Sequence, residues 1–164
     1  MSDEGITIEG LAALQQQLTD LGTKKAEKAV RKALRAGAEI ERSALSEYAP
    51  VNATGGGSIP PGALKNDIVI QMKRDTDGSI YANVTPDKYT AWVGRLVEYG
   101  HREVTGGRSK KLANGKTRGP GKQIGEVPEH PWVRPAFEAT QSEVASAITS
   151  TLLSEIEKEA AKKG

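Results

Sequence analysis

The stretch VPEHPWVRPAFE (residues 127–138) contains the transition from irregular backbone into a C-terminal helix. Its three prolines, Pro128, Pro131 and Pro135, fix their own φ angles and push each preceding residue toward extended geometry. A proline in the first helical turn loses no intrahelical hydrogen bond, so Pro135 predicts that the helix begins here. We interpret this stretch as a clamp that docks the last helix onto the rest of the fold.

The side chains of the clamp predict how it is held. Trp132 and Phe137 are two of only seven aromatic residues in the chain, so we expect both to be buried anchors. Arg134 lies between them, and Glu98 in the segment RLVEYGH is the partner we predict for it. Burying either charge alone would be unfavourable, which favours a partly buried ion pair.

Three helices are predicted from apolar periodicity. The segment GLAALQQQLTDLG (residues 10–22) has leucines three and four residues apart, and Gly22 is expected to end it. A second helix is predicted over residues 24–47, with an inner stripe of mostly small side chains. The last helix follows Pro135. The two stripes are Ala26, Val30, Ala33, Gly37, Ile40, Ala44 and Tyr48 in the second helix, and Phe137, Gln141, Val144, Ile148, Leu152, Ile156 and Ala160 in the last.

Alternating apolar residues predict the strands. Residues 68–74 and 79–85 flank Asp77-Gly78, which is typical of a hairpin turn. Residues 90–100 suit either a strand or a short helix followed by one. Ile6 and Ile8 favour a short strand or an extended arm at residues 5–9.

These elements predict an α+β fold, with a small antiparallel sheet packed against a long helix of the N-terminal half and a C-terminal helix. The 164 residues fit one domain, residues 1–164. Long loops are expected at residues 49–62, which are rich in glycine and proline, and at residues 101–127.

Composition excludes several classes of protein. The chain has no cysteine, so it can hold neither a disulfide nor a thiolate metal site. Its acidic start lacks the apolar run of a secretory signal, and no segment approaches the ~20 apolar residues of a membrane span. We therefore expect a soluble intracellular product that makes no membrane contact.

The predicted loop at residues 101–127 is strongly basic, although the formal net charge of the chain is only +2. Its cations outnumber the single carboxylate of Glu103 between residues 101 and 125. They are Arg102, Arg108, Lys110, Lys111, Lys116, Arg118 and Lys122. Such a segment suits phosphate contact, contact with an acidic protein surface, or plain solvation. No aromatic residue lies within residues 102–125, which argues against a base-stacking platform.

No catalytic motif is complete. Gly115-Lys116-Thr117 resembles the end of a phosphate-binding loop, but Lys110 occupies the position where that motif requires glycine. His101 and His130 are the only histidines and lack helical metal-ligand spacing. No GxSxG sequence is present. We expect no enzymatic activity, no cofactor and no metal.

The order of motifs resembles a known family along essentially the whole chain. GLAALQQQL, then AP with a Gly/Pro-rich loop and PPGALKNDI, then LVEYGH, and finally PWVRPAFE are similar to the tail-completion (neck) family of long-tailed bacteriophages. These are the gene-ten-type tail components of lambdoid phages, similar in role to the minor tail protein Z of phage lambda.

The resemblance implies a structural virion protein at the neck, made in the host bacterial cytoplasm. Such proteins act as a homo-oligomeric ring, here expected to be a hexamer. Their partners are the tail-tube or tail-terminator protein and the head-completion or connector proteins. On this interpretation the basic loop meets neighbouring subunits or, in the lumen, genomic DNA. The alternative is a DNA-binding accessory protein that uses residues 102–125.

Overall fold

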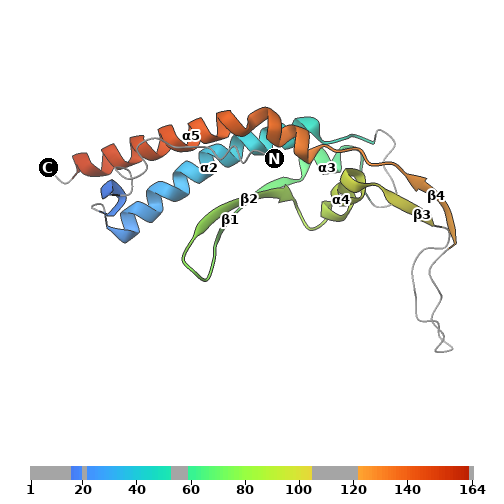
Figure 1. Cartoon of the computed structure of the whole chain (residues 1–164), viewed down its shortest axis with the longest axis horizontal. Helices are drawn as coiled ribbons and strands as arrows, with labels where there is room; N and C mark the ends of the chain where they lie inside the picture. Colours follow the sequence, from blue (N-terminus) through green and yellow to red (C-terminus); the bar gives the residue numbers. More distant parts are fainter. Residues whose placement is uncertain (1–15, 20–21, 53–58, 105–121, 163–164) are drawn as a thin grey trace, which may run out of the picture. The chain divides into compact units, whose positions relative to one another are not determined.

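The computed structural model describes residues 16–19, 22–52, 59–104 and 122–162. These residues form long helices and small two-stranded sheets, which confirms the predicted α+β class (Figure 1). The chain divides into two compact units. The first contains Met1–Ser43, Ile70–Val84 and Ala139–Gly164, and the second contains Ala44–Val69 and Thr85–Glu138.

Two long helices dominate the first unit. Helix α2 spans Thr23–Tyr48 and helix α5 spans Val133–Ala161. Gly22, at φ 82°, precedes α2 in the left-handed conformation that glycine adopts readily. Paired residues along the two helices run in opposite directions, from Lys25 with Glu159 to Glu41 with Thr140, so the helices are antiparallel.

Small side chains let α2 and α5 approach closely. Ala29 and Ala33 are 2% and 1% exposed, and Ile156 of α5 is buried. At Gly37 an added Cβ would lie 2.6 Å from Cγ1 of Ile148 and 3.1 Å from Cγ1 of Val144. Gly37 is therefore a notch that receives the side chains of α5. Of the stripe predicted from the sequence, Ala33, Gly37 and Ala44 are buried, whereas Tyr48 at its end is 43% exposed; Ala29 was not predicted.

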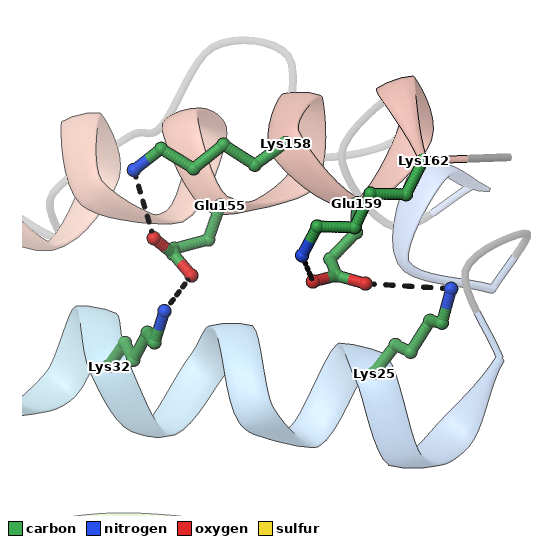
Figure 2. A network of polar contacts seen from close by, with 6 residues as sticks. All are labelled: Lys25, Lys32, Glu155, Lys158, Glu159 and Lys162. Carbon is green, nitrogen blue, oxygen red and sulfur yellow. Dashed lines mark hydrogen bonds and ion pairs between the residues drawn. The ribbon is translucent and has the colours of Figure 1, made fainter. Parts of the chain in front are cut away.

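Ion pairs link the same two helices along their edge (Figure 2). Glu155 of α5 contacts Lys32 of α2, and its other oxygen lies 3.1 Å from Nζ of Lys158. Glu159 lies 2.6 Å from Nζ of Lys162 and 3.5 Å from Nζ of Lys25. Each carboxylate thus binds one lysine of α2 and one nearby lysine of its own segment, Lys158 within α5 and Lys162 directly after it.

The neighbouring lysines lower the pKa of both carboxyl groups. The pKa of Glu155 lies below 4.5, chiefly because of the hydrogen bond from Lys32 and then that from Lys158. The pKa of Glu159 is lowered mainly by Lys162. The same contact raises the pKa of Lys162 above 10.5.

Strands β1 (Ile68–Arg74) and β2 (Ile80–Pro86) form the hairpin that the sequence predicted. Gly78 has φ 91°, and Oδ1 of Asp77 accepts a hydrogen bond of 2.8 Å from the amide of Ser79. The side chain of Ser79, and after it this amide, lower the pKa of Asp77. Arg74 at the end of β1 forms an ion pair with Glu27 of α2, which ties the hairpin to the helix.

The second unit contains helices α3 (Ala63–Asn66) and α4 (Ala91–Tyr99). Thr90, fully buried at the start of α4, donates a hydrogen bond of 2.7 Å to Oδ2 of Asp67, which follows α3. The amide of Asp87 donates to the carbonyl of Asp67 at 2.8 Å. Residues 90–100 form a short helix, α4, and a strand, β3, begins at His101, so the second of the two predicted alternatives holds.

Strands β3 (His101–Val104) and β4 (Gln123–Val127) pair antiparallel, from His101 opposite Val127 to Val104 opposite Gln123. The prediction of one continuous loop over residues 101–127 is therefore wrong at both ends. Residues 105–121 lie outside the described residues. Gly100, at φ 67°, joins α4 to β3, and a Cβ there would lie 2.7 Å from the carbonyl oxygen of Val127. No side chain fits this close approach of backbones.

Two predicted N-terminal elements lie largely outside the described residues. The predicted strand or arm at residues 5–9 lies entirely outside the described residues. Of the predicted helix in GLAALQQQLTDLG, residues 16–19 are described and are helical.

Candidate interaction surface

Helix α4 has one face turned into the second unit and one turned outward. Gly94 and Glu98, four residues apart, are buried. Trp92, Arg95 and Tyr99 are exposed at spacings of three and four residues. Because residues at these spacings share a helix face, α4 presents its bulkiest side chains to solvent and its smallest residue to the interior.

The inner face of α4 packs against Trp132 of the clamp. Trp132 is 1% exposed, and its indole Nε1 donates a hydrogen bond of 3.3 Å to the carbonyl of Gly94. A Cβ added at Gly94 would lie 3.2 Å from Cδ1 of Leu64 and 3.3 Å from Cζ2 of Trp132. The absence of a side chain at Gly94 thus gives the indole ring room to cross the helix.

Glu98 holds the beginning of α5. Its Oε2 accepts hydrogen bonds from the amides of Trp132, at 2.7 Å, and Val133, at 3.0 Å. The first amides of a helix have no intrahelical acceptor and carry partial positive charge, so a carboxylate stabilises them well. The amide of His130 also donates to the carbonyl of Val97 at 2.8 Å. The clamp is therefore fastened to α4 largely through its own backbone.

The predicted pair of Glu98 with Arg134 is wrong. Arg134 is exposed and forms no ion pair with any residue that the structure describes. Glu98 is only 8% exposed, and the backbone amides at the helix start satisfy the oxygen that faces them. Arg134 was predicted as the partner because it lies in the clamp, whereas the amides that Glu98 accepts from belong to the backbone of Trp132 and Val133.

The two predicted aromatic anchors differ. Trp132 is buried, whereas Phe137 is 54% exposed, so the prediction that Phe137 is buried is wrong. Ala136 takes the inward position one turn after Trp132 and is 0% exposed. Phe137 follows it by about 100° around the helix and so points away from that contact.

The outward face of α4 borders a groove of about 740 Å³. Trp92 is 56% exposed and Tyr99 70% exposed. Lys88, Arg95 and Val133 line the same groove. We call the set Lys88, Trp92, Arg95, Tyr99 and Val133 the α4 surface. Tryptophan, tyrosine and arginine are the residues that contribute most often to binding energy at protein interfaces.

Exposed large apolar side chains are concentrated in the second unit. Among the described residues, Tyr81 and Leu153 are the exposed examples in the first unit. The second unit has ten, namely Tyr48, Val51, Tyr89, Trp92, Tyr99, Val104, Ile124, Val127, Val133 and Phe137. Apolar surface concentrated in this way is typical of a region that contacts other proteins.

The α4 surface was not among the predictions. Residues 90–100 were predicted to be a strand or a short helix followed by a strand, with no outward face assigned. The available signal was spacing, because Trp92, Arg95 and Tyr99 fall on one side of a helix and Gly94 and Glu98 on the other.

The predicted basic residues are only partly described. Arg102 is exposed on β3, opposite Glu126 of β4. Lys122 is exposed immediately before β4. The other five, Arg108, Lys110, Lys111, Lys116 and Arg118, lie outside the described residues. The structure therefore shows where the basic segment leaves and rejoins the fold, at the open end of the β3–β4 ribbon.

Two further features are absent from the described ranges of the chain. No helix in them is both long and apolar enough to cross a bilayer. No group of three or more histidine or acidic side chains there is placed to bind a metal ion.

Comparison with known proteins gives one family. The model of the family described as "Bacteriophage HK97-gp10, putative tail-component" matches residues 12–100, which end directly after α4. No curated protein and no solved structure matches the chain. The match covers more than half of the chain and includes α2, the hairpin and all of α4.

Proposed function

Because the chain belongs to the HK97-gp10-like family of phage tail components, we propose that it is a structural subunit of the virion neck. In this role it completes the tail and joins it to the capsid connector, as one copy in a homo-oligomeric ring. Its neighbours are the tail-tube or tail-terminator protein on one side and the head-completion or connector proteins on the other. The subunit carries out no catalysis.

One observation carries the proposal beyond the family match. The α4 surface exposes Trp92 and Tyr99 next to a groove, and it lies within the matched residues. Two large aromatic side chains left in water are unfavourable for an isolated subunit, because burying each would be worth about 1.5–3 kcal/mol. They are accounted for if another protein covers them in the assembled particle.

The test measures assembly and fold separately. We expect Trp92→Ser with Tyr99→Ser to abolish self-association in native mass measurement and to prevent joining of heads to tails. The unfolding midpoint should change little, because both side chains are exposed. The matched control is Tyr81→Ser, which removes an exposed tyrosine of the first unit. Normal joining by the α4 double variant would contradict the proposal.

We further propose that the basic segment is an assembly contact. The strands before and after it, β3 and β4, pair with each other, so its two flanking residues lie at one end of a ribbon. Replacing Lys110, Lys111 and Lys116 with serine should impair joining while duplex DNA affinity stays negligible in both versions. DNA binding by the wild-type chain, with a salt slope that falls by about three in the triple variant, would instead favour the DNA-binding accessory role.

A further inference from the structure

The α4 surface has two cations that the described part of the chain leaves without a charged partner. Lys88 and Arg95 are exposed and take part in none of the ion pairs there. Along the chain Lys88 precedes Trp92, and Arg95 lies between Trp92 and Tyr99; all four line one groove. A segment that covers this surface must therefore offer both carboxylates and apolar side chains.

We propose that the α4 surface binds residues 1–10 of a neighbouring copy of the chain. That segment, MSDEGITIEG, contains Asp3, Glu4 and Glu9 and no basic side chain. Its two large branched residues are Ile6 and Ile8. Its charge and its apolar content are both complementary to the surface. The inference rests on the proposed homo-oligomer and identifies what holds one copy to the next.

The spacing of these residues suits a groove along a helix. Alternate residues of an extended peptide share a face, at about 3.3 Å per residue. A segment bound in this way presents Glu4, Ile6 and Ile8 together, which spans about 13 Å. Trp92 and Tyr99 are seven residues apart on α4, or about 10 Å along its axis. The two isoleucines can therefore fill the groove between the rings while Glu4 reaches Arg95 or Lys88.

The length of chain before the described residues allows the segment to reach another copy. Residues 1–9 precede the helix that the sequence predicts over residues 10–22. Nine extended residues span up to about 30 Å, which exceeds the radius of a domain of this size. Because the segment and the α4 surface are different parts of the chain, their contact is head-to-tail. Such contacts close into a ring when the rotation between subunits permits.

The first experiment measures the contact without requiring assembly. A chain that lacks residues 2–10 is titrated with the synthetic peptide MSDEGITIEG while tryptophan emission is recorded. Trp92 is the exposed tryptophan and Trp132 is buried, so a saturable blue shift reports on the α4 surface. A peptide with Ile6→Ser and Ile8→Ser should bind at least tenfold more weakly.

Charge reversal tests which groups meet. Arg95→Glu in the shortened chain should weaken binding of the natural peptide about tenfold, and a peptide with Glu4→Lys should recover part of the loss. Higher ionic strength should weaken the natural pair. The absence of any emission change with the natural peptide at millimolar concentration would overturn the inference.

The second experiment asks whether the contact joins two copies. One chain keeps residues 1–10 and carries Arg95→Glu with Tyr99→Ser, and the other has an intact α4 surface but lacks residues 2–10. Each should be monomeric alone, and an equimolar mixture should give a one-to-one dimer by native mass measurement. No mixed dimer, together with clear peptide binding, would show that the segment folds back on its own chain.

Failure of this inference can be separated from failure of the proposed function. If the chain lacking residues 2–10 still forms the wild-type oligomer, the segment is not the connecting part, although the ring proposal stands. If the wild-type chain stays monomeric even with tail-tube protein, the ring proposal is itself wrong.

Discussion

The two units differ in what they bury and what they expose. In the first, α2 and α5 meet through alanines and the notch at Gly37, and lysine–glutamate pairs cover their edge. In the second, the buried Trp132 packs across α4 while Trp92 and Tyr99 of that helix stay exposed to water. In the first unit, the charged side chains along the edge of the two helices pair with one another. The second leaves large apolar side chains exposed, so substitutions there can test assembly while substitutions in the core test stability.

The largest effect should come from the core of the second unit. Trp132→Ala removes a side chain that is 1% exposed and its hydrogen bond to Gly94, so the free energy of unfolding should fall by about 3–5 kcal/mol. The control is Phe137→Ala, five residues further along the chain in α5 and 54% exposed, which should change the free energy of unfolding by less than about 0.5 kcal/mol. Denaturant unfolding of both variants measures this. Equal losses would mean that the isolated chain buries Phe137 as well.

A smaller loss is expected at the start of α5. Glu98→Ala leaves the amides of Trp132 and Val133 without their acceptor, which should lower the free energy of unfolding by about 2–3 kcal/mol. Glu98→Gln keeps an oxygen in place and should lose roughly half as much. Arg134→Met should have little effect, and its combination with Glu98→Gln should be additive. Coupling between these two positions would restore the ion pair predicted from the sequence.

Within the first unit, the notch at Gly37 is the sensitive point. Gly37→Leu places a large side chain against Ile148 and Val144 and should lower the free energy of unfolding by about 1–3 kcal/mol. Gly37→Ala should be closer to neutral, because alanine favours the helix by about 1 kcal/mol while its Cβ crowds Ile148. Adding Ile148→Ala to Gly37→Leu should recover part of the loss. If Gly37→Leu has no effect on thermal or denaturant unfolding, the helices are not in close contact there.

The smallest effect should be the pH dependence of the ion pairs. Because the pKa values of Glu155 and Glu159 are lowered in the folded chain, their contribution is present above about pH 4.5 and is lost as pH falls through the folded values. The raised pKa of Lys162 acts oppositely, with a contribution lost above pH 10.5. Melting temperature should therefore depend less on pH below 4.5 in Glu155→Gln. The difference should shrink in 0.5 M salt.

The control for this pH test is Glu157→Gln, an exposed neighbour on α5. This variant should leave the dependence of melting temperature on pH below 4.5 unchanged. Identical behaviour of the two variants would mean that the lysine contacts of Glu155 do not persist in solution.

The sequence predicted the fold well where periodicity is long. The helix expected at residues 24–47 is α2, and the hairpin around Asp77-Gly78 is β1 and β2. Pro135 lies in the first turn of α5, as expected. These elements depend on local backbone preferences and on one apolar face, and both are visible in the order of residues.

What the sequence did not reveal depends on contacts between distant residues. Whether Phe137 or Ala136 faces inward is decided by where Trp132 meets Gly94, which no local pattern shows. The acceptor that Glu98 provides is likewise visible only once α4 lies beside the start of α5. The β3–β4 ribbon was missed because its strands are short and flank a long basic segment. The assignment of the seven basic residues to an assembly or lumen-facing contact stays a prediction.

The notch at Gly37 also has a mechanical consequence. The side chain of Ile148 occupies the space where a Cβ at Gly37 would lie, and the side chain of Val144 lies beside it. If α5 slid along α2 by one helical turn, about 5.4 Å, Ile148 would leave the gap and meet a position that already carries a side chain. The two helices therefore resist shear along their axis, although their ion pairs could re-form with new partners. A force pulling or pushing α5 along its axis would therefore be transmitted to α2, because the two helices would slide little against each other.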